Sequence, residues 1–146
     1  MIVVVCSVVA EHNKKFLLVS EKKNEAEGKY GLPGGQLEHG ETLEECAERE
    51  FKEETGYDAG EIELFTITHK PATQHGNSVI RFVYKTASAV ISQRSPAELQ
   101  TVWLDRDEII ALSQEGLLRG ADVLDVLDAT SKELTITIKT YRTISS

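Results

Sequence analysis

The segment Gly35–Tyr57 constrains this chain more than any other, because it predicts a single helix held between glycine-containing turns. Thr42–Glu54 is rich in Leu, Ala, Glu and Lys and has no internal Gly or Pro, a composition that favours an α-helix. Leu43, Ala47 and Phe51 are spaced i, i+4, i+8, which predicts the buried stripe of that helix. We therefore expect its remaining faces to be free for polar chemistry.

Three glutamates define the neighbouring face of the predicted helix. Glu50, Glu53 and Glu54 are spaced i, i+3, i+4, so their carboxylates should stack along one side of it. Like charges at that spacing repel, and such a face is either strongly solvated or neutralised by a cation. Acidic runs by themselves are usually solvated. Hard divalent ions such as Mg²⁺, however, take oxygen ligands of this kind and commonly share them with substrate phosphates.

The residues around these glutamates favour a cation site over a solvated acidic face. Gly35 is followed after five residues by Glu41 and after seven more by Arg49, and this spacing resembles the signature of the Nudix hydrolase family, G-x5-E-x7-R-E-U-x-E-E-x-G-U, where U is a bulky aliphatic residue. Phe51 and Tyr57 are aromatic at U positions. The charged and glycine positions all agree with the signature: Gly35, Glu41, Arg49, Glu50, Glu53, Glu54 and Gly56.

The resemblance implies a fold and a metal site. The fold would be of the α/β (α+β) class, a Nudix-type α/β/α sandwich with a mixed β-sheet between helices, and the resemblance covers roughly residues 2–129. The cofactor would be Mg²⁺, or Mn²⁺, and Tyr30 stands where the family usually has Trp. The metal ligands implied are Glu50, Glu53, Glu54 and the carbonyl oxygen of Gly35, which ends the turn-rich lead-in to the helix.

Other residues receive catalytic or bracing roles from the same resemblance. Glu41 and Arg49 would form a structural ion pair that braces the loop against the helix, so we interpret Arg49 as an orienting residue and not as a phosphate clamp. Many family members place a carboxylate before the strand that would contain Trp103, and Glu98 lies five residues before it. The alternative for Glu98 is a plain surface residue. Glu53, Glu41 and Glu98 are all candidates for the general base.

Composition fits one small domain, residues 1–146. With 146 residues and 40% hydrophobic content, the chain can bury a single core. The formal net charge is −8, and no basic stripe is present, which argues against a nucleic-acid partner. Met1–Ala10 has no basic leader and is too short to span a bilayer, so we expect no membrane partner. Cys6 and Cys46 are expected to be free thiols, which suits the cytoplasm.

The rest of the chain predicts mixed α/β order. A polar turn at Glu11–Lys14 should join the first two strands. In the tail, residues 130–146, Leu134, Ile136 and Ile138 alternate with polar residues and predict an extra strand that pairs within the chain or across a homodimer. The protein would accordingly be a monomer or a homodimer. The other predicted strands are Ile2–Val9, Phe16–Ser20, Glu61–His69, Ser78–Val90 and Leu99–Leu104, and the later helices are Arg106–Ser113 and Ala121–Ala129.

A few residues outside the motif invite functional interpretation. His69 and His75 bracket a loop, but their spacing is not that of a zinc site, and we expect solvent or substrate contacts instead. We expect His39 to be exposed and Trp103 to lie in the core. Arg81 and Tyr84 are at odd separation on one strand and should face opposite sides of the sheet, so only one can face a substrate.

The motif predicts a pyrophosphohydrolase that cleaves the diphosphate linkage of a nucleoside diphosphate joined to another group. A compact chain favours a nucleoside triphosphate or a similarly small nucleotide. An ADP-ribose or nucleotide-sugar pyrophosphatase is the alternative, and Pro71, fourteen residues beyond Tyr57, is weak support for it. A non-catalytic nucleotide sensor with the same fold is a third hypothesis. Such sensors tend to lose metal carboxylates, whereas none is missing here.

Overall fold

The structure, a computed structural model, describes residues 1–20, 28–72, 74, 76–86, 95–120 and 122–130, together with the backbone of 138–140. The N-terminal strands are β1 (Ile2–Val9), β2 (Glu11–His12) and β3 (Lys15–Ser20). The predicted turn at Glu11–Lys14 is too long, because Glu11 and His12 pair with the start of β3. The turn itself is Asn13 and Lys14, both with positive φ, as in the tight two-residue hairpin turns that match strand twist.

The strands form two sheets. The larger has the order β4-β1-β6-β5-β8 and the smaller the order β2-β3-β7. The β1–β6 and β5–β8 pairs are parallel and the remaining pairs antiparallel, which confirms the predicted mixed sheet. Residues 87–90 of the predicted strand Ser78–Val90 lie outside the described residues. The bounds of the later strands are β4 (Gly34–Gln36), β5 (Ile62–Lys70), β6 (Ser78–Thr86), β7 (Gln100–Asp105) and β8 (Ile138–Thr140).

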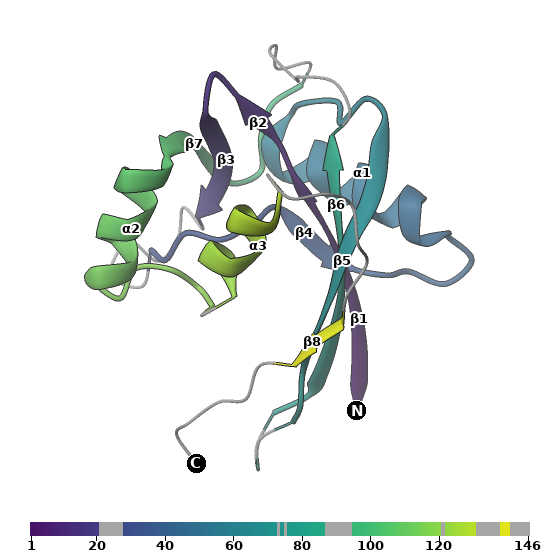
Figure 1. The fold of residues 1–146 in the computed structure, drawn as a ribbon. Coiled ribbons are helices and arrows are strands. Elements are labelled where there is room, and N and C mark those ends of the chain that lie inside the picture. Colours follow the sequence, from purple (N-terminus) through teal and green to yellow (C-terminus); the bar gives the residue numbers. More distant parts are fainter. Residues whose placement is uncertain are drawn as a thin grey trace.

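Helices cover both faces of these strands. Helix α1 (Leu43–Thr55) lies on one side, and α2 (Arg106–Gln114) and α3 (Val123–Ala129) lie on the other (Figure 1). Successive residues of β1 alternate between the two cores: Cys6 and Val8 pack with α1, and Val9 packs with α2 and α3. The chain is therefore an α/β/α sandwich, as predicted.

Helix α1 begins and ends where its capping residues place it. Thr42 accepts a hydrogen bond from the Glu45 amide while Glu45 bonds back to the Thr42 amide, a reciprocal cap that starts the helix. Gly56 ends it in the left-handed conformation, with φ of 77°. Ala47 and Phe51 are fully buried, and Leu43 packs partly buried against the same core, which confirms the predicted stripe.

The tail contributes one strand to the larger sheet. In β8, Ile138 lies opposite Ile67 of β5, in parallel register and within the same chain. The sequence left open whether the tail strand pairs within its own chain or across a homodimer, and the structure has it paired within the chain. Leu134 and Ile136 of the predicted tail strand lie outside the described residues. Within the described part of the chain, no helix is long and apolar enough to cross a membrane.

Candidate metal and substrate site

The loop before α1 comes close to both β1 and the helix at two glycines. In β4, Gly34 lies opposite Ser7 and Gly35 lies opposite Cys6 of β1. A side chain at Gly34 would collide with the Ser7 hydroxyl and the Cys6 carbonyl, and one at Gly35 would collide with the carboxylate of Glu50. This stretch, predicted as turns, is thus an edge strand whose missing side chains let a glutamate of α1 lie against the backbone.

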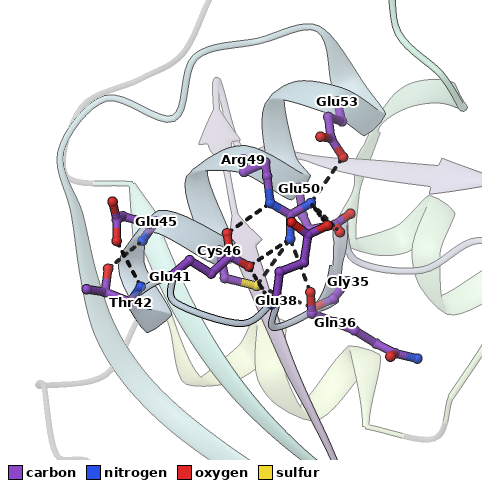
Figure 2. A network of polar contacts seen from close by, with 10 residues as sticks. All are labelled: Gly35, Gln36, Glu38, Glu41, Thr42, Glu45, Cys46, Arg49, Glu50 and Glu53. Carbon is purple, nitrogen blue, oxygen red and sulfur yellow. Dashed lines mark hydrogen bonds and ion pairs between the residues drawn. The ribbon is translucent and has the colours of Figure 1, made fainter.

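Glu41 and Arg49 form the predicted ion pair. Arg49 Nε donates to Glu41 Oε2 at 3.0 Å and Nη2 donates to Oε1 at 2.8 Å, a two-point contact between the loop and α1 (Figure 2). Arg49 Nη2 also donates to the Gln36 carbonyl oxygen at 3.1 Å. The Arg49 hydrogen bonds, aided by the Glu38 amide, lower the pKa of Glu41 to about 2. Arg49 therefore connects β4, the loop and the helix.

Arg49 also contacts two of the three carboxylates predicted as metal ligands. Its Nη1 lies 2.8 Å from Glu50 Oε1 and 3.3 Å from Glu53 Oε2, and Figure 2 shows both carboxylates turned toward the guanidinium. Among the described residues, no three His, Cys, Asp or Glu side chains converge as a ready-made metal centre. A cation bound by Glu50 and Glu53 would thus compete with Arg49 for them.

Glu54 has the environment that best fits a divalent cation. Its Oε1 accepts a 2.7 Å hydrogen bond from the Gly34 amide. Burial raises the pKa of Glu54 to about 7, the Gly34 hydrogen bond opposes this shift, and the nearby charges of Glu50 and Glu98 add to it. A bound cation would offset that accumulation of negative charge. All donors here are carboxylate and carbonyl oxygens, the set that suits Mg²⁺ or Mn²⁺.

Glu98 is brought to the same helix end by backbone hydrogen bonds. The Glu98 amide donates to the Glu53 carbonyl oxygen at 3.0 Å, and the Leu99 amide donates to the Glu54 carbonyl oxygen at 3.2 Å. Ser95 makes a third such bond, to the Gly56 carbonyl oxygen at 3.0 Å. The exposed Glu98 side chain therefore lies next to the glutamates of α1 although it is distant from them in sequence.

Comparison with known proteins agrees with this geometry. A family model described as the NUDIX domain matches residues 1–126. The chain belongs to the Nudix family. It is 30% identical over 131 residues to a Danio rerio protein named 8-oxo-dGDP phosphatase NUDT18, a match that covers 86% of this chain and 37% of the relative. It is 38% identical over 76 residues to an ADP-ribose pyrophosphatase of Methanocaldococcus jannaschii, over 52% of this chain and 45% of that one.

Solved Nudix structures share the fold. A NUDIX hydrolase from Nitrosomonas europaea superimposes with a TM-score of 0.76 at 25% identity, covering 93% of each chain. The relatives matched by sequence are longer, because this chain spans about two fifths of their length.

The structure places Arg119, which the motif does not contain, near the candidate site. Arg119 precedes α3, donates from Nε to the Lys29 carbonyl oxygen at 3.2 Å, and lies close enough to Glu54 for its charge to oppose the rise in that residue's pKa. Its side chain also lies against Gly31. Arg119 was not predicted, because a single arginine in a loop has no periodicity or spacing that links it to α1.

The remaining sequence predictions have mixed outcomes. His39 is exposed, as predicted, and His69 is the second-last residue of β5, one residue before the loop that follows Lys70. His75 lies outside the described residues. Trp103 is partly buried at the margin of the α1-side core and donates from Nε1 to the Tyr57 hydroxyl at 3.3 Å. Cys46, which is free and buried, donates from Sγ to the Gly35 carbonyl oxygen at 3.7 Å.

Proposed function

We propose that this protein is a Mg²⁺-dependent Nudix pyrophosphohydrolase that cleaves the diphosphate linkage of a nucleoside diphosphate joined to another group. The observation that carries the proposal is Glu54, a partly buried carboxylate held by the Gly34 amide beside the charges of Glu50 and Glu98. Membership of the Nudix family and the phosphatase and pyrophosphatase names of two relatives support hydrolysis of a phosphorus-containing anhydride.

The metal would be held by Glu50, Glu53, Glu54 and the Gly35 carbonyl oxygen, with Mn²⁺ as a substitute for Mg²⁺. When bound, it would offset phosphate charge and lower the pKa of an attacking water. The metal would displace part of the contacts of Arg49 with Glu50 and Glu53, at 2.8 and 3.3 Å, while Arg49 stays anchored by Glu41 and the Gln36 carbonyl oxygen.

The geometry also ranks the three candidates for the general base. Both carboxylate oxygens of Glu41 accept hydrogen bonds from Arg49, and its pKa of about 2 makes it a poor proton acceptor near neutral pH. Glu53 has one contact to Arg49, at 3.3 Å, and Glu98 is exposed beside the end of α1. We therefore assign the proton-accepting role to Glu98 or Glu53 and a bracing role to Glu41.

The preferred substrate is a nucleoside triphosphate or a similarly small nucleotide. The relatives named 8-oxo-dGDP phosphatase match 86–88% of this chain, whereas the ADP-ribose pyrophosphatase matches 52%. ADP-ribose or a nucleotide sugar is the second candidate. The net charge of −8 disfavours a nucleic-acid substrate. We propose a single domain spanning residues 1–146, active in the cytoplasm as a monomer or homodimer; the two free cysteines suit a reducing compartment.

A substrate panel with Mg²⁺ tests the function. Nucleoside triphosphates, ADP-ribose, nucleotide sugars and dinucleoside polyphosphates are assayed for released phosphate or nucleotide. Glu53→Gln and Glu54→Gln should each lower turnover at least ~100-fold with little loss of stability, because each removes charge from the metal site. Glu48→Gln, on the exposed side of α1, is the matched control and should keep full activity.

Two outcomes would contradict the proposal. Near-normal rates in both Glu53→Gln and Glu54→Gln at saturating Mg²⁺ would exclude this metal site. Tight nucleotide binding with no turnover of any substrate in the panel would favour the non-catalytic sensor instead.

A further inference from the structure

The core beneath α1 contains two thiols. Cys6 of β1 and Cys46 of α1 are both fully buried there, beside Tyr84 of β6. Tyr84 thus faces α1, whereas Arg81 of the same strand contacts Asp122 just before α3, which confirms that these two side chains face opposite sides of the sheet. Cys46 lies in the variable run of the signature, between Glu41 and Arg49, so the family resemblance gives it no role.

Three side chains of α1 each hold one residue of β4. Glu54 accepts from the amide of the first residue of β4 at 2.7 Å, and Arg49 donates to the carbonyl oxygen of the last at 3.1 Å. Between them, the Cys46 thiol donates to the carbonyl oxygen of the middle residue, Gly35, at 3.7 Å (Figure 2). The strand is therefore tied to the helix at three consecutive residues, and Cys46 makes the central tie.

The surroundings of Cys46 keep its thiol a hydrogen-bond donor. Burial raises the pKa of Cys46, and the neighbouring Cys6 thiol and Glu41 carboxylate add to that shift. Arg49 Nη2 donates to the sulfur at 4.0 Å. The sulfur thus receives one hydrogen bond while its own S–H donates another, an arrangement in which each bond polarises the next.

The distance between β4 and α1 decides where two of the candidate metal ligands lie. β4 is at the edge of its sheet, so β1 holds it on one side while side chains of α1 hold it toward the helix. One turn beyond Cys46, the carboxylate of Glu50 lies against Gly35 where a side chain would collide. A strand free to shift from the helix would move Gly35 away from Glu50 and the Gly34 amide away from Glu54.

We propose that Cys46 is a positioning residue of the metal site, whose S–H bond to the Gly35 carbonyl oxygen fixes β4 against α1 and so sets the placement of Glu50 and Glu54 around the cation. The inference rests on the proposed function, because it assigns a role at the metal site of that enzyme. Hydrogen-bonding partners behind metal ligands act in this way, since they orient the groups that contact the ion.

The test is the dissociation constant of Mn²⁺ in the absence of nucleotide, measured from the electron paramagnetic resonance signal of the free ion. Cys46→Ala removes the donor and should raise that constant at least ~5-fold, a modest effect for a partner behind a metal ligand because a thiol is a weak donor. Cys46→Ser keeps a donor in the form of a hydroxyl and should stay within ~2-fold of wild type.

Cys6→Ala is the matched control for packing. Both cysteines are 0% exposed in the same core, so the two alanine variants should lose similar amounts of melting temperature in EDTA. Cys6→Ala leaves the bond from Cys46 to β4 in place and should keep the Mn²⁺ dissociation constant within ~2-fold of wild type. Equal weakening by both alanine variants, or a serine variant no better than alanine, would assign the effect to packing and overturn the proposal.

Infrared spectroscopy gives a second measurement that needs no change at Cys46. In Cys6→Ala the remaining thiol of the chain is Cys46, so its S–H stretching band stands alone. The band should lie below the frequency of a thiol in an apolar solvent, because donation to a carbonyl oxygen weakens the S–H bond. A band at the apolar-solvent frequency would overturn the proposal even if Cys46→Ala does not fold.

Mn²⁺ binding without nucleotide separates this inference from the proposed function. If the wild type binds Mn²⁺ but hydrolyses no substrate of the panel, the proposed function fails, and the Cys46 variants still decide the inference. If the wild type binds no Mn²⁺, the inference fails together with the metal site.

Discussion

Arg49 sets the charge balance around α1, because its guanidinium lies within ion-pair distance of four glutamates: Glu38, Glu41, Glu50 and Glu53. The repulsion expected between carboxylates spaced i, i+3, i+4 is therefore relieved in part by a side chain of the same helix. A cation bound by these carboxylates would neutralise part of the negative charge that Arg49 offsets.

The bracing role of Glu41 and Arg49 predicts strong coupling between them. Arg49→Ala should destabilise the protein to urea, because it removes contacts to the loop, to β4 and to two carboxylates. Glu41→Ala should add little further loss in the double variant, since its main partner is then already absent. Losses that simply add in a double-mutant cycle would show that the two side chains act independently.

The same pair predicts a pH dependence. The folded-state pKa of Glu41, about 2, lies below its ordinary value of 4.5, so its contribution to stability is present above pH 4.5 and is lost as the pH falls toward 2. The melting temperature of wild type should exceed that of Glu41→Gln at pH 6, and the two should converge toward pH 2. A gap that stays constant between pH 6 and pH 2.5 would contradict this assignment.

At the level of elements, sequence patterns located α1 best, because its limits depend on local chemistry. The predicted helix Thr42–Glu54 differs from the observed Leu43–Thr55 by one residue at each end, since Thr42 caps the helix and does not join it. The edge strand β4 was not predicted. Its pairing with β1 depends on residues distant in sequence, and its glycines look locally like turn residues.

The strand β8 predicts a stabilising role for the tail. Truncation after Ala129 removes the parallel ladder between Ile138–Thr140 and Ile67–His69, and each lost hydrogen bond costs about 0.5–1.5 kcal/mol. A chain of this size loses roughly 2–4 °C of melting temperature for each kcal/mol. Because the ladder is intrachain, sedimentation should give the same oligomeric state before and after truncation.

The opposite outcome of that truncation would be equally informative. A shortened protein with unchanged melting temperature but lost hydrolysis would assign the tail to substrate binding. Lys139→Pro removes a single backbone donor within β8 and offers a milder version of the same comparison.

For the molecule as a whole, the motif predicted the class of fold. Most residues proposed for the site belong to the motif and lie close together in sequence. The contact of Glu41 with Arg49, eight residues apart, was implied by the family resemblance. The contact of Arg81 with Asp122 joins residues 41 apart, and no local pattern predicts it. This contact depends on how α3 packs on the sheet, and that packing requires the tertiary fold.

Residues 95–99 are attached to the end of α1 by their backbone and not by their side chains. The three anchoring bonds are donated by backbone amides, at Ser95, Glu98 and Leu99, and accepted by carbonyl oxygens that a helix end would otherwise leave unpaired. Any residue except proline can donate them, and the proline of this stretch, Pro96, stands at a position that donates none of the three. Apart from Glu98, which has a proposed catalytic role, the side chains of this segment can therefore be exchanged while its backbone keeps its place beside α1.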